Sequence, residues 1–103
     1  MSHVTVYDRR VIKTFADKHT QTLFLTGKSR QFPPYVAKRV IRKLEYLELA
    51  TRLEELRVPR GNRLKALRRN RKGQHAIVVD DRLRICFRFD DGGAQEVEVT
   101  DRH

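Results

Sequence analysis

The chain has 103 residues, with 23 Lys or Arg against 13 Asp or Glu, and its formal net charge is +10. Hydrophobic residues make up 39% and charged residues 35%, which allows one modest core and excludes a membrane span of about 20 apolar residues. The single cysteine, Cys86, excludes an internal disulfide, and no set of zinc ligands is present. The first ten residues lack the apolar region of a signal peptide, so we expect a cytoplasmic protein.

The chain is predicted to start with a polar extension, a short strand and a helix. Residues 1–10 have no hydrophobic period, and we interpret them as a flexible extension that precedes a single domain over residues 11–103. Val11–Phe15 is a β-prone run. A helix is expected to begin near Asp17 and to end at Gly27, because a polar start leads into an apolar cluster and glycine is a typical helix stop.

A second helix is predicted after two prolines. Pro33 and Pro34 favour a helix start, because proline is tolerated in the first turn of a helix and not later. A further helical turn is expected at Leu53–Leu56, before Pro59 and Gly61. The second helix carries an apolar stripe at helical spacing, made of Val36, Ala37, Val40, Ile41, Leu44 and Leu47.

The second half of the chain has strand periodicity. Turns rich in aspartate and glycine at 80–81 and 90–93 separate its last three runs. The predicted fold is therefore α+β: a strand, two helices and a four-stranded antiparallel meander, with the helices packed on one face of the sheet. The four predicted strands are Leu64–Leu67, Gln74–Val79, Leu83–Phe89 and Ala94–Thr100.

The strand Leu83–Phe89 alternates between apolar and basic residues. Its apolar residues predict a core-facing side, and Arg84 and Arg88 lie on the other side together with Cys86. Arginines on a sheet face suit contacts with phosphate, but strand arginines also commonly pair with neighbouring carboxylates. The sequence leaves both interpretations open for Arg84 and Arg88.

The positive charge is concentrated in residues 61–79, which contain six Lys or Arg and no acidic residue. Such a segment attracts polyanions, and the high charge of so small a domain favours nucleic acid as the partner. A solvated basic surface and an acidic protein partner are the alternatives. The basic residues of this segment are Arg63, Lys65, Arg68, Arg69, Arg71 and Lys72.

Six segments, in order and with matching spacing, together resemble the HigB-type toxins of the RelE/ParE superfamily in bacterial type II toxin–antitoxin systems. They are Val11–Phe15, Leu23–Arg30, Leu53–Pro59, Gly61–Leu64, Asn70–His75 and Leu83–Phe87. The resemblance covers residues 11–103 and implies the RelE-like, microbial-RNase-type fold. It implies a ribosome-dependent endoribonuclease that cuts mRNA in the A site. It also implies a helix-turn-helix antitoxin of the HigA type, through which the toxin contacts promoter DNA only indirectly.

Cleavage of this kind uses neither metal nor cofactor. The 2′-hydroxyl attacks the adjacent phosphorus, which requires a base, stabilisation of charge on the phosphoryl oxygens and an acid for the leaving oxygen. Arg84 matches the catalytic arginine of the family, and its guanidinium can hold phosphate oxygens bidentately. Asp101 and His103 match the ends of the family's Asp-Tyr-His tail, which implies that His103 is the general acid or base and that Asp101 orients it.

Two positions depart from the family pattern. Arg102 stands where the family usually has tyrosine, and an arginine can bind phosphate but cannot act as an acid at neutral pH. Lys65 stands where relatives carry His or Glu; it is either a base or a phosphate contact, and we favour the contact. The residues expected to contact RNA are Arg63, Lys65, Arg68, Arg71, Lys72 and Arg102.

The departure at Arg102 keeps two other functions open. The first is a toxin of the ParE branch, which shares the fold but inhibits DNA gyrase. The second is a degenerate, non-toxic binding module that is retained for complex formation.

Overall fold

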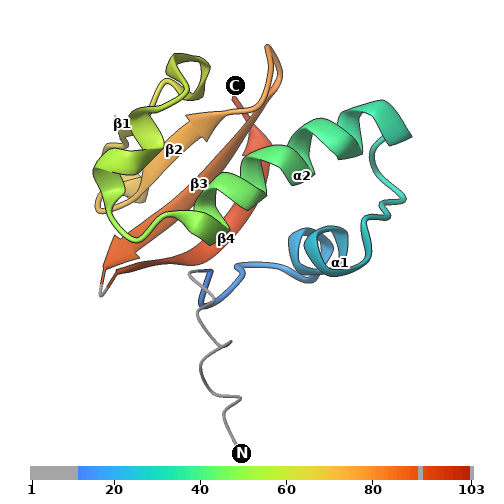
Figure 1. The fold of residues 1–103 in the computed structure, drawn as a ribbon, viewed down its shortest axis with the longest axis horizontal. Helices are drawn as coiled ribbons and strands as arrows, with labels where there is room; N and C mark the ends of the chain where they lie inside the picture. Colours follow the sequence, from blue (N-terminus) through green and yellow to red (C-terminus); the bar gives the residue numbers. More distant parts are fainter. Residues whose placement is uncertain (1–11, 91, 103) are drawn as a thin grey trace, which may run out of the picture.

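The computed structural model describes residues 12–90 and 92–102, so the expected extension at residues 1–10 lies outside the described residues. Its sheet has four antiparallel strands in the order β1-β2-β3-β4, and two helices lie on one face of it (Figure 1). The strands are β1 (Lys65–Ala66), β2 (His75–Val78), β3 (Leu83–Asp90) and β4 (Gly93–Asp101). The predicted α+β meander is confirmed, with strand boundaries within about two residues of those expected from periodicity.

Helix α1 (Lys18–Thr26) has the boundaries that the sequence predicts. The Asp17 side chain accepts a hydrogen bond of 2.6 Å from the backbone N–H of Thr20, which satisfies one of the free donors of the first turn. Gly27 ends the helix with a φ of 76°, a left-handed conformation that glycine adopts without strain. Its N–H donates to the carbonyl of Leu23 at 2.8 Å.

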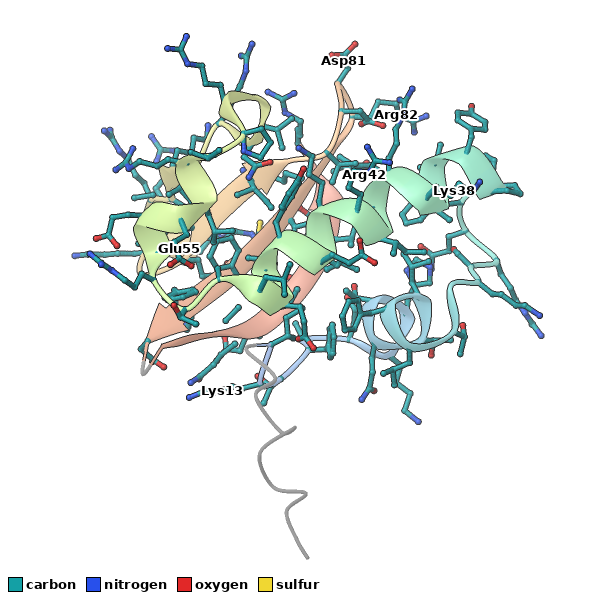
Figure 2. The ribbon with its side chains drawn as sticks, in the orientation of Figure 1. Lys13, Lys38, Arg42, Glu55, Asp81 and Arg82 are labelled. Carbon is teal, nitrogen blue, oxygen red and sulfur yellow. The ribbon has the colours of Figure 1, made fainter. Side chains whose placement is uncertain are left out.

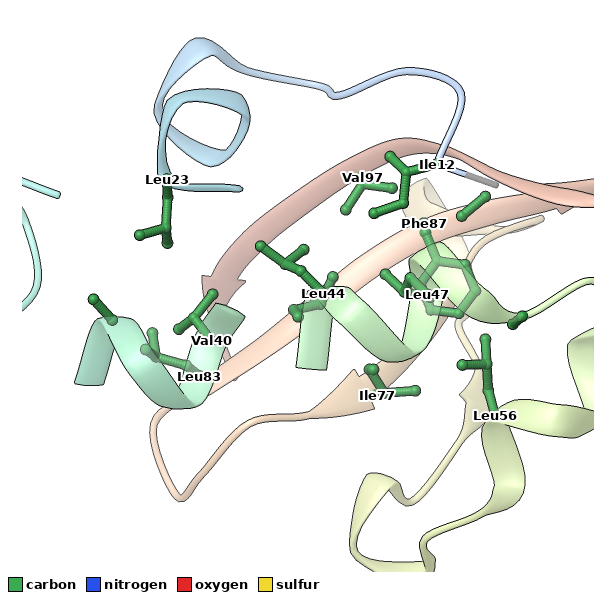
Figure 3. Packing of buried hydrophobic residues seen from close by; sticks show 14 residues of the cluster. Ile12, Leu23, Val40, Leu44, Leu47, Leu56, Ile77, Leu83, Phe87 and Val97 are labelled. Carbon is green, nitrogen blue, oxygen red and sulfur yellow. The ribbon is translucent and has the colours of Figure 1, made fainter. Parts of the chain in front are cut away.

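Helix α2 (Pro34–Leu49) crosses the sheet and supplies much of the core (Figure 3). Its predicted stripe faces the strands: Ala37, Val40, Leu44 and Leu47 are buried, and the flanking residues of the stripe are half-buried. Burial of each Leu or Val side chain is worth about 1.5–3 kcal/mol. The hydrophobic contact with the sheet therefore explains the length and orientation of this helix.

The predicted first strand is present only as two isolated bridges, in which Ile12 pairs with Ala94 and Phe15 with Val97, parallel to β4. Between these bridges the β4 backbone is irregular, because Glu96 has a φ of 53°. The N–H of Glu96 donates to the Thr14 hydroxyl at 2.8 Å instead of to a backbone carbonyl. This irregularity interrupts the regular ladder that the β-prone sequence predicts.

Two short 3-10 turns, η2 (Leu53–Arg57) and η3 (Arg60–Asn62), join α2 to β1. The side chain of Asn62 is fully buried there; it donates to the Leu56 carbonyl at 3.1 Å and accepts from Nζ of Lys43 at 2.6 Å. Burial, and the nearby charge of Arg42, lower the pKa of Lys43 below its usual 10.5. This network fixes the start of the basic segment against α2.

Strand pairing gives the sheet two different faces. Leu83, Ile85 and Phe87 point toward the helices and are buried, and we call this side the helix face. The residues that alternate with them point to the other side, which we call the open face. The open face carries two rows of paired residues, Lys65–Ala76–Cys86–Glu98 and Val78–Arg84–Thr100.

Candidate nucleic-acid interface

Arg84 lies on the open face near the start of β3, between Val78 at the end of β2 and Thr100 near the end of β4. It is half-buried, and its Nε donates to the hydroxyl of its register partner Thr100 at 3.4 Å. Within residues 12–90 and 92–102 no carboxylate lies within ion-pair distance of Arg84. A neutral partner orients the guanidinium without cancelling its charge, so Arg84 can bind a phosphate bidentately.

Arg88, four residues further along the same strand, has a different partner. Its Nε donates to Oε1 of Glu96 at 3.1 Å, in an ion pair that is roughly half-exposed. Its guanidinium also passes close over Gly73, since a Cβ added there would lie 2.5 Å from Nη1 of Arg88. The two strand arginines therefore differ. Arg88 is paired with a carboxylate, whereas Arg84 is not and is available to contact phosphate.

Arg71 reaches the open face from the short turn η4 (Arg69–Arg71). Its Nη1 donates to Oε1 of Gln74 at 3.0 Å and to Oε1 of Glu98 at 3.3 Å. Both members of the ion pair are about one third exposed, with a side-chain accessibility of 31% each. The contact draws this part of the basic segment toward the row that contains Glu98.

The remaining predicted RNA contacts lie on the loop beside the sheet and on its edge. Lys65 is exposed on β1, at the end of the row that also contains Glu98. Arg63, Arg68 and Lys72 are exposed, and none of them is in an ion pair within the described part of the chain. These side chains extend the positive charge from the open face along one border of the sheet.

The end of β4 does not bring all of the predicted catalytic residues together. Asp101 pairs with Leu83, which places it on the helix face, away from Arg84. It lines a groove of about 650 Å³ between the start of α2 and the β2–β3 turn. Arg102 is exposed; its N–H donates to the Arg82 carbonyl at 2.8 Å and its Nη1 to the Asp80 carbonyl at 3.0 Å. His103 lies outside the described residues.

Sequence reasoning missed Glu98 and Thr100. Both lie on the open face, and each contacts one of the predicted arginines, Arg71 and Arg84 respectively. The sequence of the last strand could have indicated them, because Glu96, Glu98 and Thr100 alternate with valines there. Polar residues at every second position of a strand beside a basic strand predict cross-strand partners for its arginines.

Two other reactive side chains of the sheet are buried. Cys86 is fully buried on the open face, and its Sγ lies 3.8 Å from the Thr100 hydroxyl. His75 lies on the helix face against Phe87, with ring centroids 6.3 Å apart, and its Nδ1 is buried without a hydrogen-bond partner among the described residues.

Basic side chains also project from other parts of the surface, as Figure 2 shows for Lys38 and Arg42 on α2 and for Arg82 beside the β2–β3 turn. Total charge therefore does not mark the site. The open face is distinguished by Arg84, whose orientation is fixed while its charge stays uncompensated. Neither helix among the described residues is long and apolar enough to cross a membrane.

The α+β meander and its arginine-bearing face define a RelE-like toxin. The family model for the RelE-like toxin of the type II toxin–antitoxin system HigB matches residues 13–103, and the chain belongs to this family. A toxin of this family has an antitoxin as its partner.

Two curated relatives agree with this assignment. The chain is 36% identical over 81 residues to Toxin HigB-1 of Vibrio cholerae serotype O1, an alignment that covers 78% of this chain and 85% of the relative. It is 30% identical over 93 residues to Endoribonuclease HigB of Proteus vulgaris, which covers 90% of this chain and 100% of the relative.

Proposed function

We propose that this toxin is an endoribonuclease that cuts mRNA in the A site of the ribosome and thereby inhibits translation in the cytoplasm. The observation that carries the proposal is Arg84, held by a neutral hydroxyl on the open face with its charge uncompensated. The Proteus vulgaris relative, which is aligned over its full length, carries the name of an endoribonuclease. The exposed basic border of the sheet supplies the contacts that a polyanionic substrate requires.

In this proposal Arg84 stabilises the charge that develops on the phosphoryl oxygens, because a preorganised guanidinium strengthens its interaction as the charge forms. Lys65 contacts the same phosphate, and the other basic residues predicted to contact RNA bind mRNA and ribosomal RNA. They are Arg63, Arg68, Arg71, Lys72 and Arg102. His103 is proposed as a proton-transfer group with Asp101 as its positioning residue, as the family tail implies.

The proposed partners follow from the same assignment. The antitoxin is proposed to be a helix-turn-helix protein of the HigA type, and promoter DNA is contacted through it. The ribosome presents the mRNA in the conformation that is cleaved.

Induction of the toxin in growing cells, with mapping of transcript ends, tests the proposal. We expect growth arrest and new breaks within translated mRNA. Arg84→Ala should lower the cleavage rate by about 10²–10³-fold, because it removes one preorganised charge from the transition state. Full growth arrest with intact transcripts would contradict the proposal.

Inhibition of DNA gyrase is the second candidate, because Arg102 stands where the family usually has tyrosine and an arginine cannot act as an acid at neutral pH. The guanidinium of Arg102 donates instead to the backbone carbonyl of Asp80. Inhibition of supercoiling by purified protein, without any effect on translation, would establish this function.

A further inference from the structure

The proposed reaction needs a group that removes the proton of the attacking 2′-hydroxyl. On the open face the register places Glu98 one row from Arg84, on the neighbouring strand. Successive rows on one face of a strand are about 7 Å apart, since each residue rises about 3.4 Å. A carboxylate at this position can reach the ribose of the nucleotide whose phosphate is bound by Arg84.

The other carboxylates and the histidine on the described strands lie elsewhere, and Asp90 is at the far end of β3 from Arg84. His75 and Asp101 lie on the helix face. Glu96 is at the irregular part of β4 and holds Arg88 at 3.1 Å. Glu98 is therefore the acidic residue that the sheet places beside Arg84.

The side chain of Glu98 is partly accessible to a substrate, with an exposed fraction of 31%. Its row continues through Ala76 and Cys86, which are both buried, to the exposed Lys65 on the edge strand. The carboxylate and the ammonium therefore lie at the two ends of this row. The charged or polar groups around Glu98 are Arg71 and Gln74 from the basic segment, Arg84 on β3 and Thr100 on β4.

The contact between Glu98 and Arg71 does not prevent this role. It is a single contact of 3.3 Å between two groups that are each 31% exposed. Ion pairs with this exposure contribute little to stability, so a phosphate of the RNA can replace the carboxylate at Arg71. Binding of the substrate would then release Glu98 at the place where the base is needed.

We propose that Glu98 is the general base of the cleavage reaction, an inference that rests on the proposed endoribonuclease function. The carboxylate takes the proton of the 2′-hydroxyl, and the O2′ atom forms a bond to phosphorus while the bond from phosphorus to O5′ breaks. The leaving O5′ takes a proton from water. The products are a 2′,3′-cyclic phosphate and a 5′-hydroxyl, and Glu98 returns its proton to water, so that no net proton is gained or lost.

Single-turnover cleavage of a defined mRNA on purified ribosomes, measured as a function of pH, tests the inference. Glu98→Gln should lower the rate by about 10²-fold or more and should remove the acidic limb of the pH–rate profile. Glu98→Asp, which keeps a carboxylate, should retain that limb. The matched control is Glu96→Gln, which also removes the carboxylate partner of an arginine on the same strand and should cleave like the unmodified toxin.

A positioning role gives a different result. If Glu98 acts only by holding Arg71, then Arg71→Ala should match the loss of Glu98→Gln, and the double variant should lose nothing more. An unchanged pH profile in Glu98→Gln together with that equality would overturn the inference. If the unmodified toxin cleaves mRNA and Glu98→Gln cleaves it equally fast, the inference about Glu98 is wrong but the proposed function stands. If the unmodified toxin leaves mRNA intact, the proposed function itself is wrong.

Discussion

The two faces of the sheet are stabilised by different means. On the helix face, side chains such as Leu44, Ile85 and Phe87 are fully buried against each other. On the open face, each arginine is held by one polar residue of β4 across the surface of the sheet. Buried apolar area contributes far more free energy than half-exposed polar pairs. The open face can therefore be altered for function without unfolding the protein.

The largest expected effect comes from trimming the helix face. Leu44→Ala should lower the free energy of unfolding by about 2–5 kcal/mol, because it removes a fully buried side chain and leaves a cavity. Leu49→Ala on the same helix is the control; Leu49 is 76% exposed, and its loss should cost less than about 0.5 kcal/mol. Urea unfolding measures both variants, and equal losses would contradict the claim that burial on the helix face supplies the stability.

The next comparison separates two arginines of the open face. Arg84→Ala and Arg88→Ala should each change the free energy of unfolding by less than about 1 kcal/mol, because neither side chain is deeply buried. Only Arg84→Ala should lower the rate of mRNA cleavage, by about 10²–10³-fold, since Arg88 is already neutralised by Glu96. Parallel unfolding and ribosome cleavage assays check this, and equal loss of cleavage in both variants would show that the pairing of Arg88 has no consequence.

A smaller effect is expected where the basic segment meets the sheet. Gly73→Ala should destabilise by about 1–2 kcal/mol, because alanine is strained at positive φ. Gly73 has a φ of 94°, and the added Cβ would also displace the guanidinium of Arg88. Gly61→Ala is the control, since nothing lies within 4 Å of its added Cβ. Thermal unfolding of both variants measures the difference, and equal midpoints would contradict the expectation.

The smallest effect concerns Lys43, whose pKa is lowered by burial and by the charge of Arg42. Between this lowered pKa and 10.5, the unfolded chain binds more protons than the folded protein, so stability should rise with pH. Lys43→Arg keeps its charge throughout this range and should lack that contribution. Urea unfolding at several alkaline pH values compares the two proteins. Identical pH slopes would show that Lys43 titrates normally when folded.

Much of the fold could be predicted from local patterns. The stripe on α2, the polar start and glycine stop of α1, and the strand alternation each depend on neighbours within a few residues. Local sequence could not predict that residues 12–15 form two isolated bridges instead of a regular strand. The interruption comes from the backbone of Glu96, which contacts Thr14 from more than 80 residues away. The buried network of Asn62 was also missed, because its partner Lys43 lies on a different element.

The sequence was enough to predict which arginines belong to the candidate site, but not which residues bind them. Alternation on β3 was enough to assign Arg84 and Arg88 to one face. It could not show that Arg88 has a carboxylate partner while Arg84 has a hydroxyl. That difference depends on how β4 pairs with β3, including the register shift between the pairs Cys86–Glu98 and Arg88–Gln95. A shift of one residue would exchange the faces of all the side chains of that strand.

The sequence by itself determined the excess positive charge, its concentration in residues 61–79, the order of helices and strands, and the family resemblance. Each of these depends on composition or on local spacing. Only the tertiary structure decided that Glu98 lies beside Arg84 and that Asp101 lies on the opposite face. Strand pairing brings together residues that are distant in sequence, such as Arg71 and Glu98, and no local pattern specifies which of them meet.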